Sequence, residues 1–116
     1  MKTLFLYQCF LLLIPAISYR GFAQEWRSLG LENEPITVIT VDWSNPEVIY
    51  AGSGSNFSAG TVGGIFKTTN GGASWDTLVR GVTVQDIDIH PQNPDILYAT
   101  LGINGLTFAG IIKSLN

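Results

Sequence analysis

Short apolar runs separated by glycine, asparagine and proline recur along the chain from about residue 36 onward. These runs are rich in β-branched and aromatic residues, which favour extended backbone, and the residues between them favour turns. They predict strands at Thr37–Trp43, Val48–Gly52, Gly64–Thr69 and Ser74–Leu78. Outside the N-terminal segment no stretch has a convincing 3.6-residue period. The pattern predicts an all-β fold.

One stretch, Gly64–Leu78, predicts a β-hairpin with its turn included. Asn70-Gly71 lies between its two apolar runs, and this pair tolerates the positive φ of a tight turn. The side-chain oxygen of Asn70 is expected to accept hydrogen bonds from nearby backbone N–H groups.

The chain contains an internal repeat with a period of nearly 50 residues. Val41–Ala51 matches Ile89–Ala99, and the two Asn-Pro pairs are 48 residues apart. Gly64–Asn70 matches Gly110–Asn116 at a spacing of 46, and Trp26–Leu29 matches Trp75–Leu78 at a spacing of 49. In the second repeat the apolar positions of the first strand are Val84, Ile87 and Ile89, around Asp86 and Asp88. A repeat of 40–50 residues with four strands is typical of a β-propeller blade.

The predicted turn carries a family pattern. Thr68, Asn70, Gly72, Ser74 and Trp75 follow the order Ser/Thr-x-Asp-x-Gly-x-Thr/Ser-Trp, with Asn70 where aspartate is usual. This stretch resembles the Asp-box (BNR) repeat. Together with the Asn-Pro-x-x-x-Tyr-Ala sequence it is similar to the propellers of sortilin-type receptors, xyloglucanase-type glycoside hydrolases and photosystem II assembly factors. The resemblance covers essentially all of residues 24–116 and implies a structural role for the five residues, on the outer hairpin turn of a blade.

The resemblance implies about two four-stranded antiparallel blades of an incomplete β-propeller. Residues 24–30 would be the last strand of one blade, 36–78 one blade, and 82–116 a truncated blade. Since propellers close with about four to eight blades, we expect the N-terminal piece of a longer propeller, or a truncated product, whose partners include the remaining blades. In a closed propeller the strand around Trp26 would pair with the final blade.

Residues 1–23 predict a signal-peptide helix. Lys2 precedes Leu4–Ile17, an apolar run of 14 residues, and Gly21-Phe22-Ala23 supplies small residues for cleavage after Ala23. The run is short for a transmembrane helix, which needs about 20 apolar residues, although an uncleaved anchor is the alternative. We therefore expect a secreted or extracytoplasmic protein without a membrane anchor after cleavage.

Composition excludes several classes of function. Residues 24–116 hold four basic and nine acidic side chains, a formal charge of −5, which argues against nucleic acid and anionic membranes as partners. The one cysteine, Cys9, lies in the signal segment, so no disulfide is expected. His90 is the one histidine, so neither a metal site nor a cofactor is expected.

The binding candidates are Trp43, Asn56 and Phe57. Trp43 stands where the second repeat has Pro91 and is the better candidate for stacking on a sugar, with packing as the alternative. Asn56-Phe57-Ser58 fits an N-glycosylation acceptor within a predicted Gly/Ser-rich loop, Gly52–Gly64. A second such loop is predicted at Gly102–Gly110. Trp26 and Trp75 are expected in the core.

The case for catalysis is weaker. Asp86 and Asp88 lie two residues apart on a predicted strand, hence on one face, and glycoside hydrolysis needs two carboxylates. The alternative is a solvated face. In the xyloglucanase-type branch an aspartate precedes Val-Gly-Gly, whereas here Thr61 precedes Val62-Gly63-Gly64. We therefore expect a non-catalytic module that binds protein or polysaccharide. The alternative is the N-terminal part of a glycoside hydrolase, xyloglucanase-like or sialidase-like, with its carboxylates elsewhere.

Overall fold

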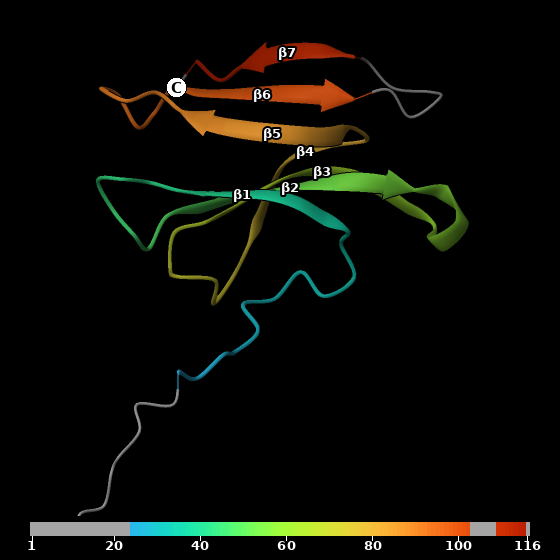
Figure 1. Cartoon of the computed structure of the whole chain (residues 1–116), viewed down its shortest axis with the longest axis horizontal. Coiled ribbons are helices and arrows are strands. Elements are labelled where there is room, and N and C mark those ends of the chain that lie inside the picture. The colour runs from blue at the N-terminus through green and yellow to red at the C-terminus, as the bar shows by residue number, and fades with distance from the viewer. Residues whose placement is uncertain (1–23, 103–108, 116) are drawn as a thin grey trace, which may run out of the picture.

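The computed structural model describes residues 24–102 and 109–115, with the main chain alone at Phe57. This part of the chain forms two antiparallel β-sheets and one 3-10 turn, η1 (Phe57–Ala59) (Figure 1). The first sheet consists, in order, of β1 (Ile36–Val41), β2 (Ile49–Asn56), β3 (Thr61–Thr68) and β4 (Asp76–Arg80). The second sheet consists of β5 (Thr83–Ile89), β6 (Leu97–Gly102) and β7 (Gly110–Lys113). The predicted all-β class is confirmed.

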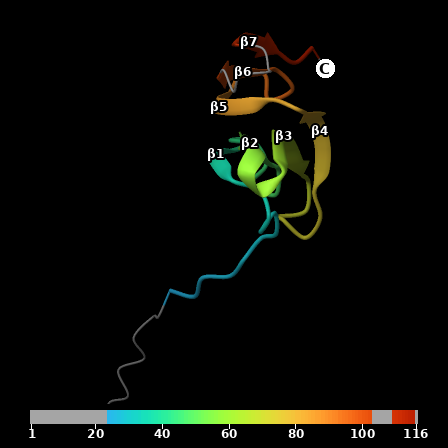
Figure 2. The ribbon, with the colours of Figure 1, turned by 90° about the vertical axis from the view of Figure 1, so that its right-hand side faces the viewer.

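The two sheets are stacked, with β5 as the strand that packs against the first sheet (Figure 2). β5 contacts β1, β2 and β3. Val84 and Ile87 of β5 both point toward the first sheet and are 0% and 3% exposed. They form one core with Tyr50 and Ile65 of the first sheet and Leu101 of the second.

Strand pairing repeats between the two sheets. Adding 48 to both members of a β1–β2 pair gives a β5–β6 pair: Ile39–Ala51 becomes Ile87–Ala99, Thr40–Tyr50 becomes Asp88–Tyr98, and Val41–Ile49 becomes Ile89–Leu97. Lys67 of β3 pairs with Tyr50 and lies over its ring, as Lys113 of β7 does with Tyr98. The sequence repeat is therefore also a repeat of backbone register.

Each repeat also has a bulge at the same position. The register shifts between Ile36 and Val38 in β1, and between Val84 and Asp86 in β5. A bulge inserts one extra residue and so interrupts the two-residue alternation of faces. This explains why the two buried residues of β5, Val84 and Ile87, are three positions apart.

Two regions differ from the predictions. Residues 24–30 form no strand in the described structure and extend away from both sheets, where no neighbouring strand pairs with them (Figure 1). Gly52–Gly64 is mostly strand, because β2 runs to Asn56 and β3 begins at Thr61. The predicted signal peptide (1–23) and most of the predicted loop Gly102–Gly110 (103–108) lie outside the described residues.

One glycine in this segment, Gly52, serves packing between the sheets. Gly52 is buried in β2, and a Cβ atom added there would lie 2.5 Å from Cγ1 of Val84 and 2.8 Å from Cγ1 of Val38. A side chain would therefore push β5 off the first sheet. The composition typical of a loop reflects close contact of two sheets at this position.

Candidate functional site

Three turns lie at one end of the sheets: residues 42–48, 69–75 and 90–96. Gly71 N–H donates to the Glu47 carbonyl oxygen (2.9 Å), which joins the second turn to the first. The Trp43 indole N–H donates to the His90 carbonyl oxygen (3.3 Å), which joins the first turn to the third. This end of the molecule is a connected set of turns, hereafter the turn face.

The 42–48 and 90–96 turns have the same hydrogen bonds. Asp42 N–H donates to Val48 O, Asn45 N–H to Asp42 O, and Val48 N–H to Asn45 O, and the same three bonds occur 48 residues later. The side chains of Asn45 and Asn93 each accept from the N–H two residues on. These are the Asx interactions expected of Asn-Pro turns.

The Asp-box-like turn is organised by the Asn70 side chain. Its Oδ1 accepts from the Ser74 N–H (2.9 Å) and the Thr68 hydroxyl (2.8 Å), and its Nδ2 donates to Ser74 Oγ (2.8 Å). The Thr68 hydroxyl in turn accepts from Gly72 N–H (3.0 Å). Positive φ falls on Gly71 and Gly72, at 65° and 90°, and not on Asn70. The turn therefore differs from a two-residue Asn-Gly turn.

The tryptophans do not share one environment. Trp75 is partly buried and donates its indole N–H to Leu29 O (2.7 Å), which ties the N-terminal segment to the Asp-box-like turn. Trp26, expected in the core, is 84% exposed. Trp43 is 58% exposed, and its N–H is fixed by His90. A fixed, exposed indole on the turn face suits stacking on a flat apolar surface such as a sugar ring.

Asn56 and Phe57 lie at the opposite end of the first sheet from Trp43. Trp43 lies in the turn that precedes β2, and Asn56 is the last residue of β2. The seven residue steps along β2 from Ile49 to Asn56 span about 23 Å. The structure therefore does not bring the three binding candidates together. Asn56 is exposed and its Oδ1 accepts from Ala59 N–H (3.2 Å), while the Phe57 side chain lies outside what is described.

Thr61 closes the loop between β2 and β3. Its hydroxyl donates to Asn56 O (3.3 Å) and accepts from Asn56 N–H (3.0 Å). The position that the xyloglucanase pattern gives to a carboxylate therefore holds a hydroxyl already committed to the backbone.

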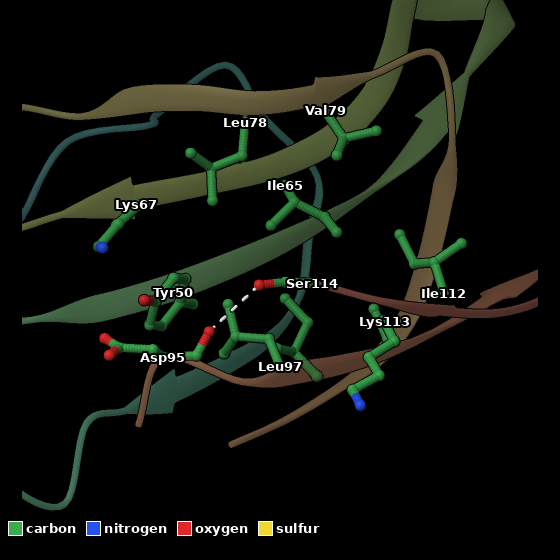
Figure 3. Close-up of a pocket in the computed structure, with 12 residues that line it drawn as sticks. Tyr50, Ile65, Lys67, Leu78, Val79, Asp95, Leu97, Ile112, Lys113 and Ser114 are labelled. Carbon is green, nitrogen blue, oxygen red and sulfur yellow. Dashed lines mark hydrogen bonds between the residues drawn. The ribbon is translucent and has the colours of Figure 1, made fainter. Parts of the chain in front are cut away.

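A cleft of about 420 Å³ opens between the outer strands of the two sheets (Figure 3). Ile65, Leu78 and Val79 of the first sheet form one wall, and Leu97 and Ile112 of the second form the other. The walls are apolar because they belong to the same faces of the two sheets that form the core. Near β5 these faces are in contact with each other, and farther from β5 they line the cleft. The cleft suits apolar side chains or an apolar ligand.

Few polar groups reach this cleft. Lys67 Nζ lies over the Tyr50 ring, 5.3 Å from its centre, and the Ser114 hydroxyl donates to Asp95 O (3.3 Å). Lys113 points away from the cavity (Figure 3) and lies over the Tyr98 ring. Of the described residues that line the cleft, Asp95 is the one acid.

Asp86 and Asp88 are exposed on the other face of the second sheet. They pair with Thr100 and Tyr98, whereas the residue between them, Ile87, pairs with Ala99, which lines the cleft. Neighbouring strand residues point to opposite faces. The two carboxylates therefore share a face, as predicted, but it is a solvated one.

Among the described residues, two carboxyl groups have clearly shifted pKa values. The pKa of Asp42 is lowered by the Ser44 hydroxyl and then by the Ser44 N–H, both of which donate to Oδ1 at 2.7 Å. The pKa of Glu32 is lowered by the Ser28 hydroxyl, which donates to Oε1 at 2.7 Å. Both shifts arise from hydrogen bonds to the charged form. They stabilise local turns.

The remaining chemistry of the described residues is limited. Residues 24–102 and 109–115 contain no group of three or more His, Cys, Asp or Glu side chains arranged to hold a metal ion. No helix within the same ranges has the length and apolar character needed to span a membrane.

Two features were missed by sequence reasoning: the cleft and the Trp43–His90 bond. Both depend on how the two sheets stack. That stacking rests on contacts between residues far apart in the sequence, such as Gly52 with Val84. Trp43 and Pro91 occupy equivalent positions in the two repeats, and this change of residue type was the signal in the sequence that the two turns differ.

Comparison with protein-family models, curated proteins and solved structures finds no match for this chain.

Proposed function

We propose that this chain is the Asp-box β-propeller portion of a secreted, non-catalytic protein that binds glycan through its turn face. The observation that carries the proposal is the repetition of one unit twice, with the same strand register, the same bulge and the same turn bonds. Repeated four-stranded units stacked face to face are the construction principle of propellers. Such proteins bind through the loops at the ends of the blades.

The turn face is the better of the two ends for binding. Trp43 is exposed there with its indole N–H held by His90, so little side-chain freedom is lost when a ligand stacks on the ring. The hydrogen bonds of all three turns hold the surrounding backbone in place. A preorganised aromatic surface is what a sugar-binding face requires.

Two observations favour binding over hydrolysis. Thr61 stands at the position where a carboxylate would be needed, and its hydroxyl is bonded to the Asn56 backbone. Asp86 and Asp88 are exposed on the face of the second sheet away from the cleft. A retaining or inverting glycosidase needs two carboxylates flanking one bond inside a binding site.

The test is binding of the purified protein to an array of soluble polysaccharides, followed by a titration with the strongest hit. Trp43→Ala is expected to weaken binding about fivefold, because loss of an aromatic contact costs about 1 kcal/mol. The control is Val62→Ala, which removes an exposed apolar side chain at the other end of the first sheet and is expected to leave affinity unchanged.

The hydrolase alternative is measured in the same experiment by the release of reducing ends from the bound polysaccharide. Release that persists in a preparation free of contaminating activity would contradict the non-catalytic proposal. Equal binding by the Trp43→Ala and Val62→Ala variants would contradict the turn face as the site.

A further inference from the structure

Asn70 is followed by Gly71, and an asparagine before glycine is the one that loses its side-chain amide most readily. In this reaction the glycine nitrogen gives up its proton and forms a bond with Cγ of the asparagine. The Cγ–Nδ2 bond breaks, Nδ2 takes up a proton, and ammonia leaves a five-membered imide behind. Water then opens the imide at one of its two carbonyl groups, which gives aspartate or isoaspartate. Glycine allows the attack because it has no side chain beside the reacting nitrogen.

The Gly71 nitrogen is engaged in the folded chain. Its N–H donates to the Glu47 carbonyl oxygen at 2.9 Å. A carbonyl oxygen accepts this hydrogen bond but does not remove the proton. The Glu47 carboxylate also lies against Gly71, since a Cβ atom added there would be 2.6 Å from Oε2. A negative charge at this position opposes formation of the amide anion, so both contacts slow the first step.

The Asn70 side chain is fixed in another direction. Oδ1 accepts from the Ser74 N–H and the Thr68 hydroxyl, and Nδ2 donates to Ser74 Oγ. The Asn70 backbone is held as well, because its N–H donates to Thr68 Oγ1 (3.3 Å) and its carbonyl oxygen accepts from Ala73 N–H (3.3 Å). Ring closure requires Cγ to leave Thr68 and Ser74 and to turn onto the Gly71 nitrogen.

Two of these hydrogen bonds also have an opposing effect. Negative charge develops on Oδ1 when a nitrogen attacks Cγ, and the two donors to Oδ1 stabilise that charge. This assistance acts only after the nitrogen has reached Cγ. Because the same bonds keep Cγ away from that position, we expect their restraint to outweigh their assistance.

We propose that Asn70 is a site of spontaneous deamidation, and that the reaction proceeds only when the 69–75 turn opens. Local opening of a turn requires less free energy than unfolding of the whole chain. The reaction therefore records how often this turn opens, and water is its one co-reactant.

The two products differ in how they fit the turn. Aspartate keeps the backbone unchanged and offers an acceptor to the Ser74 N–H and the Thr68 hydroxyl. In isoaspartate the main chain runs through Cβ and Cγ, so it is one atom longer, and the carbonyl oxygen on Cγ belongs to the backbone. The side-chain acceptor at this position is thereby lost. We expect the closed turn to retain the aspartate form and to exclude the isoaspartate form.

The first experiment follows deamidation of the full chain at mildly alkaline pH, in buffer and in denaturant. Trypsin cuts after Lys67 and Arg80 and releases residues 68–80, in which Asn70 is the one amide side chain. Because three side-chain hydrogen bonds must open first, we expect the folded chain to react about 30- to 100-fold more slowly than the unfolded chain. Equal rates, a faster rate in the folded chain, or no reaction in denaturant each overturn the proposal.

A pair of variants tests whether the turn itself controls the rate. Ser74→Ala removes the acceptor of Nδ2 and is expected to raise the rate in the folded chain about fivefold. Thr61→Ala is the matched control, because it removes a hydroxyl with two backbone bonds at the other end of β3. Its rate is expected to equal that of the parent. Equal acceleration in both variants would mean that unfolding of the whole chain controls the reaction, which overturns control by the turn.

The products have their own test. Chains deamidated in denaturant are returned to buffer and treated briefly with chymotrypsin, which cuts after Trp75 where the turn is open. In the closed turn Trp75 is partly buried and bonded to Leu29 O. We expect isoaspartate to be concentrated in the cut chains, and asparagine and aspartate in the intact ones. Equal proportions of isoaspartate in both fractions overturn its exclusion from the turn, and aspartate as the sole product in denaturant overturns ring closure.

Discussion

Gly52 and Val84 are in such close contact that the two sheets have no room for a side chain between them at this point. The ideal Cβ position on Gly52 lies 2.5 Å from Val84 Cγ1. Val84 is fully buried, and it belongs to β5, the strand through which the second sheet contacts the first. The stacking of the two sheets therefore depends on a glycine at position 52.

Gly52→Ala is expected to destabilise the protein by about 1–3 kcal/mol, because overpacking forces backbone or rotamer shifts. Gly54→Ala is the matched control on the same strand and face. Its Cβ would lie 3.5 Å from Thr37 Cγ2, an ordinary contact, and its φ is not positive. Chemical denaturation measures the free energy of unfolding of both variants. An equal decrease in that free energy in the two variants would contradict a specific contact at Gly52.

The Asn70 side chain gives a second prediction. Asn70→Ala removes three hydrogen bonds and leaves the Thr68 hydroxyl, on a residue that is 1% exposed, without its acceptor. The expected loss is about 2–3 kcal/mol of unfolding free energy.

Asn70→Asp separates hydrogen bonding from residue identity at this turn. Aspartate keeps an acceptor for Ser74 N–H and Thr68 Oγ and offers a second oxygen to the Ser74 hydroxyl. Its unfolding free energy at neutral pH is expected to lie within about 0.5 kcal/mol of the parent. A loss as large as that of Asn70→Ala would show that the amide Nδ2 is essential.

The sequence predicted most of the strands because each is bounded by turn residues that act locally. Asn45 and Asn93 bond to their own turns, and their effect is independent of the rest of the fold. The extent of β2 and β3 was underestimated because Gly52 and Gly64 lie in strands where glycine is normally disfavoured. Gly52 contacts Val84 of the other sheet and Gly64 lies against the Val79 backbone of β4, and no local pattern contains either contact.

The same limit applies to the candidate site. Trp43 was singled out from one difference between repeats, Trp43 against Pro91, and the structure leaves it exposed on the turn face. Its bond to His90 joins residues 47 positions apart, so it required the stacked arrangement. Residues 24–30 resemble a strand in sequence, but a strand needs a partner, and the described chain gives this segment none.

His90 provides a third prediction, from the repeat. Its Nδ1 accepts a hydrogen bond from Gln92 N–H (3.1 Å). At the equivalent position of the first repeat, Asp42 Oδ1 accepts from Ser44 N–H (2.7 Å). His90→Asp is expected to preserve the turn, and His90→Leu to cost about 1 kcal/mol through the unmade bond. Thermal unfolding at pH 7 distinguishes them, and equal melting temperatures would argue that the Nδ1 bond contributes nothing.

Asp42 gives a prediction for pH. Its pKa in the folded protein is lowered by the Ser44 hydroxyl and by the Ser44 N–H. A carboxyl group whose folded pKa is below its unfolded value stabilises the protein above the unfolded pKa, about 3.9 for aspartate. That contribution is lost as the pH falls through the lowered folded pKa.

The measurement compares the parent with Asp42→Asn by denaturant unfolding from neutral pH down to the acid transition. Because asparagine keeps an acceptor oxygen but does not titrate, the parent is expected to be the more stable at pH 7. The difference should shrink only below about pH 4, where the unfolded carboxyl group takes up its proton. Ser44→Ala in the parent removes the hydroxyl that contributes most to the shift, and should reduce the same pH-dependent difference. A difference that stays constant across this range would mean that the charge of Asp42 does not stabilise the turn.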